Sequence, residues 1–475
     1  MSNCFDILKE KIKGKRCAIL GLGVSNLPLL RLLLSLKSAS SITVYDKKPK
    51  EELLDSDLQL DGVDFVCGAD CFAQIDADVI FRSPGIRPDI PGLRKAIEAG
   101  AELTSEIELL LALTEAHTLA LTGSDGKTTT TTLVGKFLEA SSRRVFVGGN
   151  IGTPLLDKCD IMNKDDTCVL ELSSFQLMRA SRAPHRAAIT NVSPNHLDWH
   201  TDEEEYLAAK KNIVGENTRL LVVNADCAPT ADFGREIAEN TDKQVIFFSS
   251  SRSSHADITR DAPSAYSIYR KDGAIYLCDG KSECKMLDER EIRLPGIHNI
   301  ENYMCAIALC YGLVNEADIL AVAREFTGVE HRLEPVRTLD GADYINGSID
   351  SSPTRTIAAL SALRGRDIVL ICGGYDKNLD YSPLAPVLCK TVRAVVLTGN
   401  TAKKIENALL ACPDFVDGAP QIHHADSFEN AVLIARSIAH QGSCVLLSPA
   451  SASFDRFKNF VERGRYFKKL VMELE

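Results

Sequence analysis

The chain lacks the features that mark membrane and secreted proteins. Its longest apolar stretch, residues 27–36, is short and contains Arg31, and the opening MSNCFDILKEKIKGKR mixes both charge signs without an apolar region. A membrane-spanning segment and a signal peptide are therefore not expected. We expect no membrane insertion and a cytoplasmic location.

Paired cysteines with metal-binding spacing are also absent. The fifteen cysteines, an odd number, are scattered through apolar runs without any C-x-x-C pair. This pattern is typical of reduced core residues, and it argues against a disulfide scaffold or a zinc site.

A surplus of basic residues is missing as well. The 475 residues include 54 Lys and Arg against 65 Asp and Glu, which gives a net charge of -11. That balance argues against nucleic acid as a partner. The composition, 45% hydrophobic and 25% charged, is that of a globular protein, and the length predicts about three domains.

The chain does contain three successive units in which strand-like runs alternate with helix-like runs. Residues 1–107 predict a Rossmann-like sheet, and residues 331–475 predict a second one. Residues 108–330 predict a central parallel sheet of the P-loop ATPase kind, with a small antiparallel element at the hairpin around Asp272 and Gly273. The fold class is therefore α/β with three domains, joined without low-complexity linkers.

The segment 117–134, HTLALTGSDGKTTTTTLV, predicts a strand, a glycine-rich turn and a helix. It contains G-x-x-G-K-T from Gly123 to Thr128, with fewer residues between the glycines than the standard P-loop has. Gly126 would let the backbone approach phosphate oxygens, Lys127 would neutralise charge, and the Thr128 hydroxyl would ligate Mg²⁺. ATP is thus the expected ligand. The predicted nucleotide-contacting residues of the loop are Ser124, Asp125, Gly126, Lys127, Thr128, Thr129 and Thr130.

A second glycine turn lies near the amino terminus. Gly21, Gly23 and Asn26 approximate G-x-G-x-x-G. Asp46 follows at about the sequence spacing expected for the acid that contacts a ribose. Three interpretations remain open: a nucleotide-diphosphate pocket, such as one for UDP; an NAD site; and a purely structural turn. In the first of these, a pyrophosphate would sit near Val24 and Ser25.

Three polar residues follow predicted strands downstream of the phosphate loop. These are Asn150, Glu171 and His196. Because parallel sheets gather ligands at the carboxyl ends of their strands, the three should converge beside the loop, where a carboxylate is a natural Mg²⁺ ligand. A lone histidine in a loop is more often a solvated residue.

The order of these motifs resembles the Mur ligases of peptidoglycan synthesis over essentially the whole chain. The motifs are TGSDGKTTTTT, GGNIGTP, LELSSFQL, NVSPNHLDWH, YLAAKKNI, LPGIHNIENYMCAIA, GVEHRLE and SPASASFDRFKNFVERG. LELSSFQL with SPASASFDRFKNF is most similar to members that add D-glutamate to UDP-N-acetylmuramoyl-L-alanine. The resemblance implies an ATP-dependent amide ligase that forms an acyl phosphate, a UDP-binding first domain, a central ATP-binding domain, a last domain that binds the amino acid, and a monomer.

The resemblance also implies roles for individual residues. Lys127 would hold the β and γ phosphates, Thr128 and Glu171 would share one Mg²⁺, and His196 and Lys210 would serve a second metal, with Lys210 carbamylated by CO₂. The remaining contacts would be Asn150 and Asp46 with the UDP substrate, Asn299, Asn302 and Arg332 with ATP, and Lys377, Ser453 and Phe460 with D-glutamate.

Two positions depart from the family pattern. Asp125 stands where many relatives have Asn, and Gly347 stands where an acid commonly touches the nucleotide, with Asp350 as a candidate to compensate. Two alternatives to this function remain. One is a ligase of the folylpolyglutamate synthetase kind, a family that lacks the UDP-binding domain. The other is a catalytically idle nucleotide-binding protein, for which Gly347 is the hint.

Overall fold

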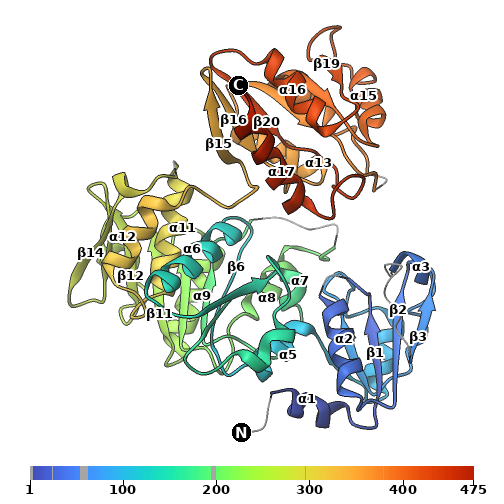
Figure 1. The fold of residues 1–475 in the computed structure, drawn as a ribbon. Helices are drawn as coiled ribbons and strands as arrows, with labels where there is room; N and C mark the ends of the chain where they lie inside the picture. Colours follow the sequence, from blue (N-terminus) through green and yellow to red (C-terminus); the bar gives the residue numbers. More distant parts are fainter. Residues whose placement is uncertain (1–3, 24, 54–61, 194–198, 295, 378) are drawn as a thin grey trace. The chain divides into compact units, whose positions relative to one another are not determined.

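The structure is a computed structural model that describes residues 4–475 except 24, 54–61, 194–198, 295 and 378. The chain divides into two compact units, Met1–Phe326 and Thr327–Glu475 (Figure 1). The first unit contains two sheets and the second contains one. All three sheets are wholly or largely parallel, so the predicted α/β class is confirmed.

The first sheet is fully parallel and has the order β3-β2-β1-β4-β5. Reversal of the strand order beside β1 is the Rossmann arrangement, in which ligands bind at the carboxyl edge. Its strands are β1 (Arg16–Leu20), β2 (Ser41–Asp46), β3 (Val63–Cys67), β4 (Val79–Arg82) and β5 (Glu102–Thr104). Its helices are α1 (Cys4–Ile12), α2 (Asn26–Leu36), α3 (Lys50–Leu53) and α4 (Pro91–Glu98).

The second sheet has the order β14-β13-β12-β11-β10-β9-β6-β8-β7 and is parallel from β7 to β12. Its strands are β6 (His117–Thr122), β7 (Val145–Gly149), β8 (Thr167–Glu171), β9 (Arg186–Ile189), β10 (Leu220–Asn224), β11 (Gln244–Ser249), β12 (Tyr266–Lys271), β13 (Ala274–Cys278) and β14 (Glu283–Asp288). The predicted hairpin joins β12 to β13: Asp272 and Gly273 both have positive φ, as a tight two-residue turn requires.

Helices cover the second sheet and link it to the first. They are α5 (Glu106–Leu113), α6 (Lys127–Ala140), η1 (Leu156–Ile161), α7 (Ser174–Leu177), α8 (Glu203–Lys211), α9 (Ala228–Asn240), α10 (His255–Ile258), η2 (Glu289–Glu291), α11 (Ile297–Leu309) and α12 (Glu316–Glu325). One apolar cluster includes Leu8 of α1, Leu33 of α2, Leu110 of α5 and Leu156 of η1. The two sheets of the first unit therefore share a continuous core.

The third sheet has the order β15-β16-β20-β17-β18-β19 and is parallel except for the pair β15 and β16. Its strands are β15 (Glu334–Leu339), β16 (Ala342–Asn346), β17 (Asp367–Cys372), β18 (Val392–Leu397), β19 (Gln421–His424) and β20 (Ser443–Leu447). Its helices are α13 (Pro353–Ala362), α14 (Ala385–Thr391), α15 (Ala402–Leu410), α16 (Phe428–Ile438) and α17 (Phe460–Glu473).

Alternation along the strands of the third sheet gives it two buried faces. Leu370 of β17 packs in a cluster with Leu388 of α14, whereas the next residue, Ile371, packs with Val432 of α16. Successive side chains of a strand point to opposite faces, so a run that is apolar throughout must be covered on both sides.

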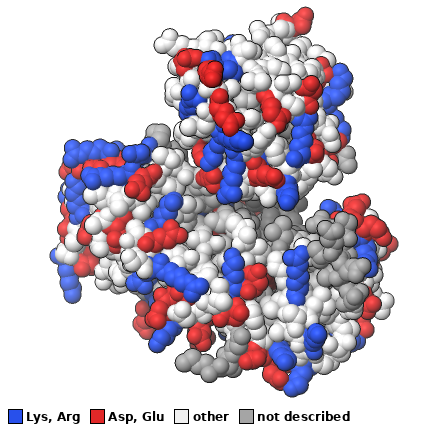
Figure 2. Space-filling view, in the orientation of Figure 1, with Lys and Arg blue, Asp and Glu red and all other residues white. Residues whose placement is uncertain are grey.

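Three further expectations concern the cysteines, membrane-spanning helices and surface charge. All fifteen cysteines are free, as predicted. Among the described residues, no helix combines the length and the apolar character that crossing a lipid bilayer requires. On the face shown in Figure 2, Lys and Arg side chains are interspersed with Asp and Glu, and this face offers no broad basic field to a polyanion.

Candidate active site

The phosphate loop lies between β6 and α6, as predicted. Gly123 has φ +155° and Gly126 has φ +77°, both in the region that favours glycine. A Cβ atom at position 123 would lie 1.8 Å from Thr190 Oγ1, and one at position 126 would lie 2.3 Å from Asn302 Oδ1. Both glycines are therefore required by backbone conformation and by close packing.

Residues after β9 hold the loop in place. The Ser124 amide donates to the Asn191 carbonyl at 3.0 Å, and the Asp125 amide donates to Asn191 Oδ1 at 2.9 Å. The Thr190 hydroxyl donates to the Asp125 carbonyl at 2.6 Å. The backbone that would cradle a phosphate is thus positioned by the neighbouring strand end, and the Asp125 side chain is exposed.

Two lysines converge on one carbonyl of this loop. Lys127 Nζ donates to the carbonyls of Gly123 at 3.0 Å and Ser124 at 2.8 Å. Lys210 Nζ, at the end of α8, donates to the same Gly123 carbonyl at 2.7 Å. Lys210 is 1% exposed, and its burial, followed by the charge of Lys127, lowers its pKa to about 7. The two cationic groups form a centre suited to an anion.

Glu171 ends β8, directly beside β6. Its carboxylate is buried at 2% exposure, and Oε1 accepts a hydrogen bond from Asn150 Nδ2 at 2.8 Å. Oε2 has no hydrogen-bond partner among the residues that the structure describes. A buried carboxylate oxygen without a partner is costly unless a ligand or ion completes it, so the acid fits a divalent cation. Asn150, expected at the substrate, is bonded to this acid.

The first turn of α6 packs against α11. Thr130 Oγ1 donates to Asn302 Oδ1 at 3.2 Å, and Asn302 Nδ2 donates to Asn299 Oδ1 at 3.3 Å. The structure thus brings both predicted asparagines to the loop. Thr128 and Thr129 are partly buried in the same turn.

A cavity of about 600 Å³ lies over the first glycine turn, between Gly21 to Gly23 and Trp199. This volume is within the range of small-molecule sites. Asp46 lines the cavity, but its Oδ2 already accepts from the Leu22 amide at 2.8 Å and its Oδ1 from the Lys48 amide at 2.9 Å. Asp46 therefore fixes the shape of the turn.

The rest of this turn is partly described. Asn26, which stands in the third glycine position, donates from Nδ2 to the carbonyls of Leu20 and Gly21. Ser25 is partly buried at the start of α2. Val24 and His196, both predicted site residues, lie outside the described residues.

Three predicted residues belong to the second unit. Lys377 is exposed, with Nζ 5.3 Å from the centre of the Phe454 ring, and Ser453 is 2% exposed. Phe460 begins α17 and meets the His331 ring edge to face. The loops around them are held by the buried Arg463 guanidinium, which sequence reasoning missed. It donates to carbonyl oxygens at residues 348, 451 and 452.

Gly347 and Asp350 are adjacent in the second unit. A Cβ atom at position 347 would lie 2.7 Å from Asp350 Oδ2, so the carboxylate of Asp350 fills the space that a side chain at position 347 would need. Asp350 is 7% exposed, and burial raises its pKa to about 6. The predicted residue Arg332 is exposed and is among the charges near Asp350.

Several polar residues near the phosphate loop were not predicted. Tyr206 OH lies 3.0 Å from Ser124 Oγ, and His200 is buried between Glu205 and Ser174. The spacing of Tyr206 and Lys210, one helical turn apart, was a signal for a shared face. No sequence signal indicated the partners of His200.

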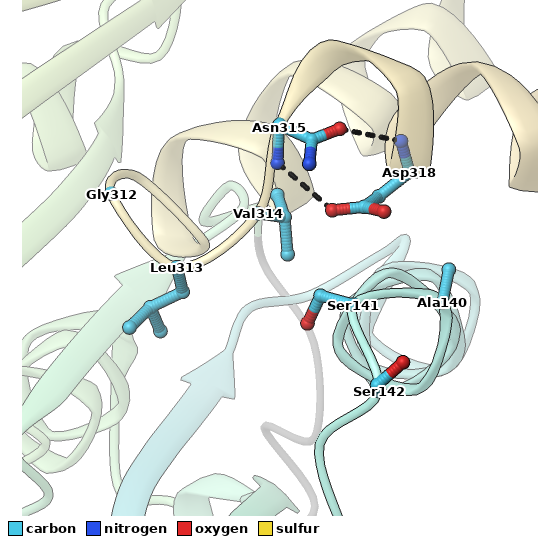
Figure 3. Close-up of a pocket in the computed structure, with 8 residues that line it drawn as sticks. All are labelled: Ala140, Ser141, Ser142, Gly312, Leu313, Val314, Asn315 and Asp318. Carbon is cyan, nitrogen blue, oxygen red and sulfur yellow. Dashed lines mark hydrogen bonds between the residues drawn. The ribbon is translucent and has the colours of Figure 1, made fainter.

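A second hollow, of about 460 Å³, lies at the carboxyl end of α6 (Figure 3). Its polar side chains Asn315 and Asp318 are engaged with each other's backbone amides in a capping box. The amides at the amino end of α12 already donate to Asn315, and the Asp318 carboxylate repels anions, so this hollow is a poor phosphate site. In the part of the chain that the structure describes, no group of three or more His, Cys, Asp and Glu could hold a metal.

Comparisons with known proteins agree with the geometry of the phosphate loop. Three family models match: Mur ligase MurD-like, N-terminal domain, over residues 15–105; Mur ligase middle domain, over 121–310; and Mur ligase, glutamate ligase domain, over 331–451. A UDP-N-acetylmuramoylalanine–D-glutamate ligase of Ruminiclostridium cellulolyticum is 42% identical over the full length of both chains. That of Acetivibrio thermocellus is 41% identical, again over both full lengths.

The chain belongs to the Mur ligase family. Among solved structures, the UDP-N-acetylmuramate-alanine ligase MurC of Thermotoga maritima has a TM-score of 0.52 at 18% identity, covering 96% of this chain and 99% of its own. E. coli FolC, in complex with DHPP and ADP, has a TM-score of 0.53 at 16% identity, covering 77% of this chain and 92% of its own. These likenesses concern the fold, which is that of the Mur ligases.

Proposed function

We propose that this protein is an ATP-dependent ligase that adds D-glutamate to UDP-N-acetylmuramoyl-L-alanine during peptidoglycan precursor synthesis. The assignment of these two substrates is supported by the names of relatives that match over their full length. The observation that carries the chemistry is the unpartnered Glu171 Oε2 beside a phosphate loop where two lysines meet.

The reaction proceeds in two steps. A carboxylate oxygen of UDP-N-acetylmuramoyl-L-alanine attacks the γ-phosphorus of ATP, ADP leaves, and an acyl phosphate forms. The amine of D-glutamate then attacks the acyl carbon, the C–N bond forms, and phosphate and a proton leave. Lys127 offsets the repulsion between the anionic nucleophile and the triphosphate, so the contribution of the protein is positioning and charge.

Mg²⁺ is the cation that fits the site. Glu171 Oε2 and the Thr128 hydroxyl would hold it, with phosphate and water oxygens completing the oxygen donors that Mg²⁺ prefers. When bound, Mg²⁺ neutralises charge on the phosphates. The proposed second cation would use Lys210 and His196.

Lys210 is proposed to act as a carbamate. Its pKa of about 7 leaves a large fraction of the amine neutral near physiological pH, and a neutral amine can attack the carbon of CO₂. The new N–C bond forms with loss of a proton, and the product carries an anionic pair of oxygens. Such a group can ligate a cation, whereas the ammonium cannot.

The other site residues follow from the same proposal. The UDP part occupies the cavity over the first glycine turn, near Val24, Ser25 and Asp46. The amino-acid contacts are Lys377, Ser453 and Phe460. The ammonium of Lys377 and the hydroxyl of Ser453 suit a dicarboxylate. Asn150 supports the substrate through Glu171, and Asn299, Asn302 and Arg332 contact ATP.

Asp350 is proposed to replace the acid that the family commonly has at position 347. Its carboxylate lies where that side chain would project, and its burial beside Ser448 fixes its direction. In this proposal the acid that meets the nucleotide has moved along the chain from position 347 to position 350.

The domain bounds that we propose are 1–107 for the UDP substrate, 108–330 for ATP and 331–475 for the amino acid. We also propose that the protein acts as a monomer in the cytoplasm, where ATP and UDP-sugars are available.

A coupled assay of ADP release tests the function. Release should require UDP-N-acetylmuramoyl-L-alanine and D-glutamate together, and a panel of D- and L-amino acids should leave D-glutamate as the preferred acceptor. Release with a folate acceptor would favour the folylpolyglutamate synthetase alternative. Tight nucleotide binding without any release would favour an idle homologue.

A further inference from the structure

One wall of the substrate cavity is built around Trp199, the single tryptophan of the chain. The Arg87 guanidinium, which also lines the cavity, lies 5.1 Å from the centre of the Trp199 ring and donates to the Trp199 carbonyl at 2.5 Å. The indole Nε1 donates to the Gly85 carbonyl at 3.2 Å. The wall is therefore fixed in one arrangement when these contacts are made.

Arg87 ties this wall to α8. Its guanidinium bonds both carboxylate oxygens of Glu205, with Nη2 to Oε1 at 2.9 Å and Nη1 to Oε2 at 3.1 Å, and also pairs with Asp89. The two-point pair with Glu205, with the hydrogen bonds of Thr201 and His200 behind it, lowers the pKa of the Glu205 carboxyl to about 2. A bidentate arginine pair sets both distance and orientation.

His200 stands at the centre of this contact set. Its ring is buried, with Nδ1 3.2 Å from Glu205 Oε2 and Nε2 2.9 Å from the Ser174 hydroxyl. It also packs edge to face on Trp199 and on Tyr206, with ring centres 4.8 and 5.2 Å apart. One side chain thus touches the cavity wall at Trp199, the first residue of α7 and two residues of α8.

Two connections lead from His200 to the catalytic groups. Through Ser174 it reaches the first residue of α7, in the turn that follows Glu171. Through α8 it reaches Tyr206, whose hydroxyl meets Ser124 of the loop. Lys210 lies one helical turn after Tyr206 on α8 and contacts the loop carbonyl.

We propose that Arg87, Glu205, His200 and Ser174 form a relay that couples occupancy of the cavity at Trp199 to the phosphate loop, with His200 as its central positioning residue. A ligand that fixes Arg87 and Trp199 also fixes the start of α8 and the turn after Glu171. Nucleotide binding at the loop then costs less ordering, and by linkage nucleotide improves binding at the cavity by the same factor. The inference deepens the proposed function and rests on its assignment of the two ligand sites.

Fluorescence of Trp199 measures this coupling directly. The dissociation constant of UDP is determined from Trp199 emission, without and with a saturating non-hydrolysable ATP analogue and Mg²⁺. UDP lacks the muramoyl group, so it has no carboxylate to meet the γ-phosphate, and any coupling passes through the protein. In the wild type the analogue should tighten UDP binding by about fivefold or more, the lower end of typical allosteric couplings.

The variants Ser174→Ala, His200→Ala and the double variant locate the coupling. Each should bring the ratio of the two dissociation constants close to one, and the double variant should lose no more than either single one. His185→Ala is the matched control. His185 immediately precedes β9, and its half-buried ring is hydrogen-bonded to Thr118 of β6, so the ratio of the two dissociation constants should stay at the wild-type value. Ser174→Ala removes only a hydroxyl, so it carries the test if His200→Ala does not fold.

Turnover gives a second readout. The relay variants should raise the KM of the UDP substrate at saturating ATP by about the coupling factor that they lose, about fivefold or more, because nucleotide no longer tightens binding at the cavity. A wild-type ratio near one, or an unchanged ratio in Ser174→Ala, overturns the relay. A protein that couples UDP to nucleotide but does not release ADP overturns the proposed function and leaves the relay standing.

Discussion

Replacing Asp350 with asparagine should make the second unit more stable and the enzyme weaker. The carboxyl group is 7% exposed, and burial raises its pKa from 3.8 to about 6, although Ser448 and nearby arginines act in the opposite direction. A shift of about two units corresponds to roughly 3 kcal/mol between the charge states. The ionised carboxylate therefore destabilises the folded state by about that amount.

The sign follows from proton linkage. Because the folded-state pKa is raised, the folded protein binds this proton more tightly, and the stability linked to it is lost as the pH rises through 6. Asp350→Asn keeps an oxygen that can accept from the Ser448 hydroxyl and removes only the charge. The increase in the free energy of unfolding should be full near pH 8 and should disappear as the pH falls toward 4.

Thermal unfolding followed by circular dichroism between pH 4 and pH 8 checks this expectation. For a unit of this size, about 3 kcal/mol corresponds to a rise in Tm of roughly 6–12 °C, as an upper value. The matched control is Asp367→Asn, which should destabilise at pH 8: despite partial burial, hydrogen bonds from Arg393 and Ser443 lower the pKa of that carboxyl. A variant of Asp350 that is no more stable than the wild type at pH 8 refutes the burial argument.

The same variant tests the role of the acid. If Asp350 faces the nucleotide, Asp350→Asn should raise the KM for ATP by about tenfold, equivalent to about 1.4 kcal/mol, and leave the KM for the UDP substrate unchanged. If the variant is more stable but its KM for ATP is unchanged, burial does disfavour the charge of Asp350, but Asp350 does not contact the nucleotide.

Three further substitutions probe the phosphate loop. Lys127→Ala should leave the fold intact and reduce ADP release to less than about a tenth of the wild-type rate, and a faster variant would contradict its role at the transferring phosphate. Gly126→Ala combines positive φ with a Cβ atom 2.3 Å from Asn302 Oδ1, so we expect a loss of stability of about 1–3 kcal/mol and weaker ATP binding, measured by thermal unfolding and calorimetry. Lys210→Ala should be nearly inactive and partly rescued by short carboxylic acids, and full activity without added acid would exclude the carbamate.

Much of the fold follows from periodicity that is local in the sequence. The run IVLIC, residues 368–372, is apolar at every position, which is typical of a strand covered on both faces, and β17 is such a strand. The Asp272 and Gly273 turn is equally local, because two residues with positive φ specify the hairpin. Neither inference needs knowledge of distant residues.

The candidate site is predictable only where its determinants are local. The spacing of Gly123, Gly126 and Lys127 indicated the phosphate loop, but nothing local indicated that Thr190 and Asn302 would enforce those glycines. Pairing across long sequence separations decides such contacts. The pair of Arg87 with Glu205 spans 118 residues, and no pattern in either segment names its partner.

Charged groups that are crowded or buried indicate where ligand charge belongs. Lys127 and Lys210 bring two amino groups to one carbonyl, and an anion or a carbamate would relieve the repulsion between them. Glu171 keeps one oxygen without a partner, and Asp350 keeps a buried carboxylate whose charge burial disfavours. A fold selected for stability alone would not retain such groups. Their persistence is what a site needs if phosphate, cation and carboxylate charges are to be supplied by substrates and Mg²⁺ and to be lost again with products.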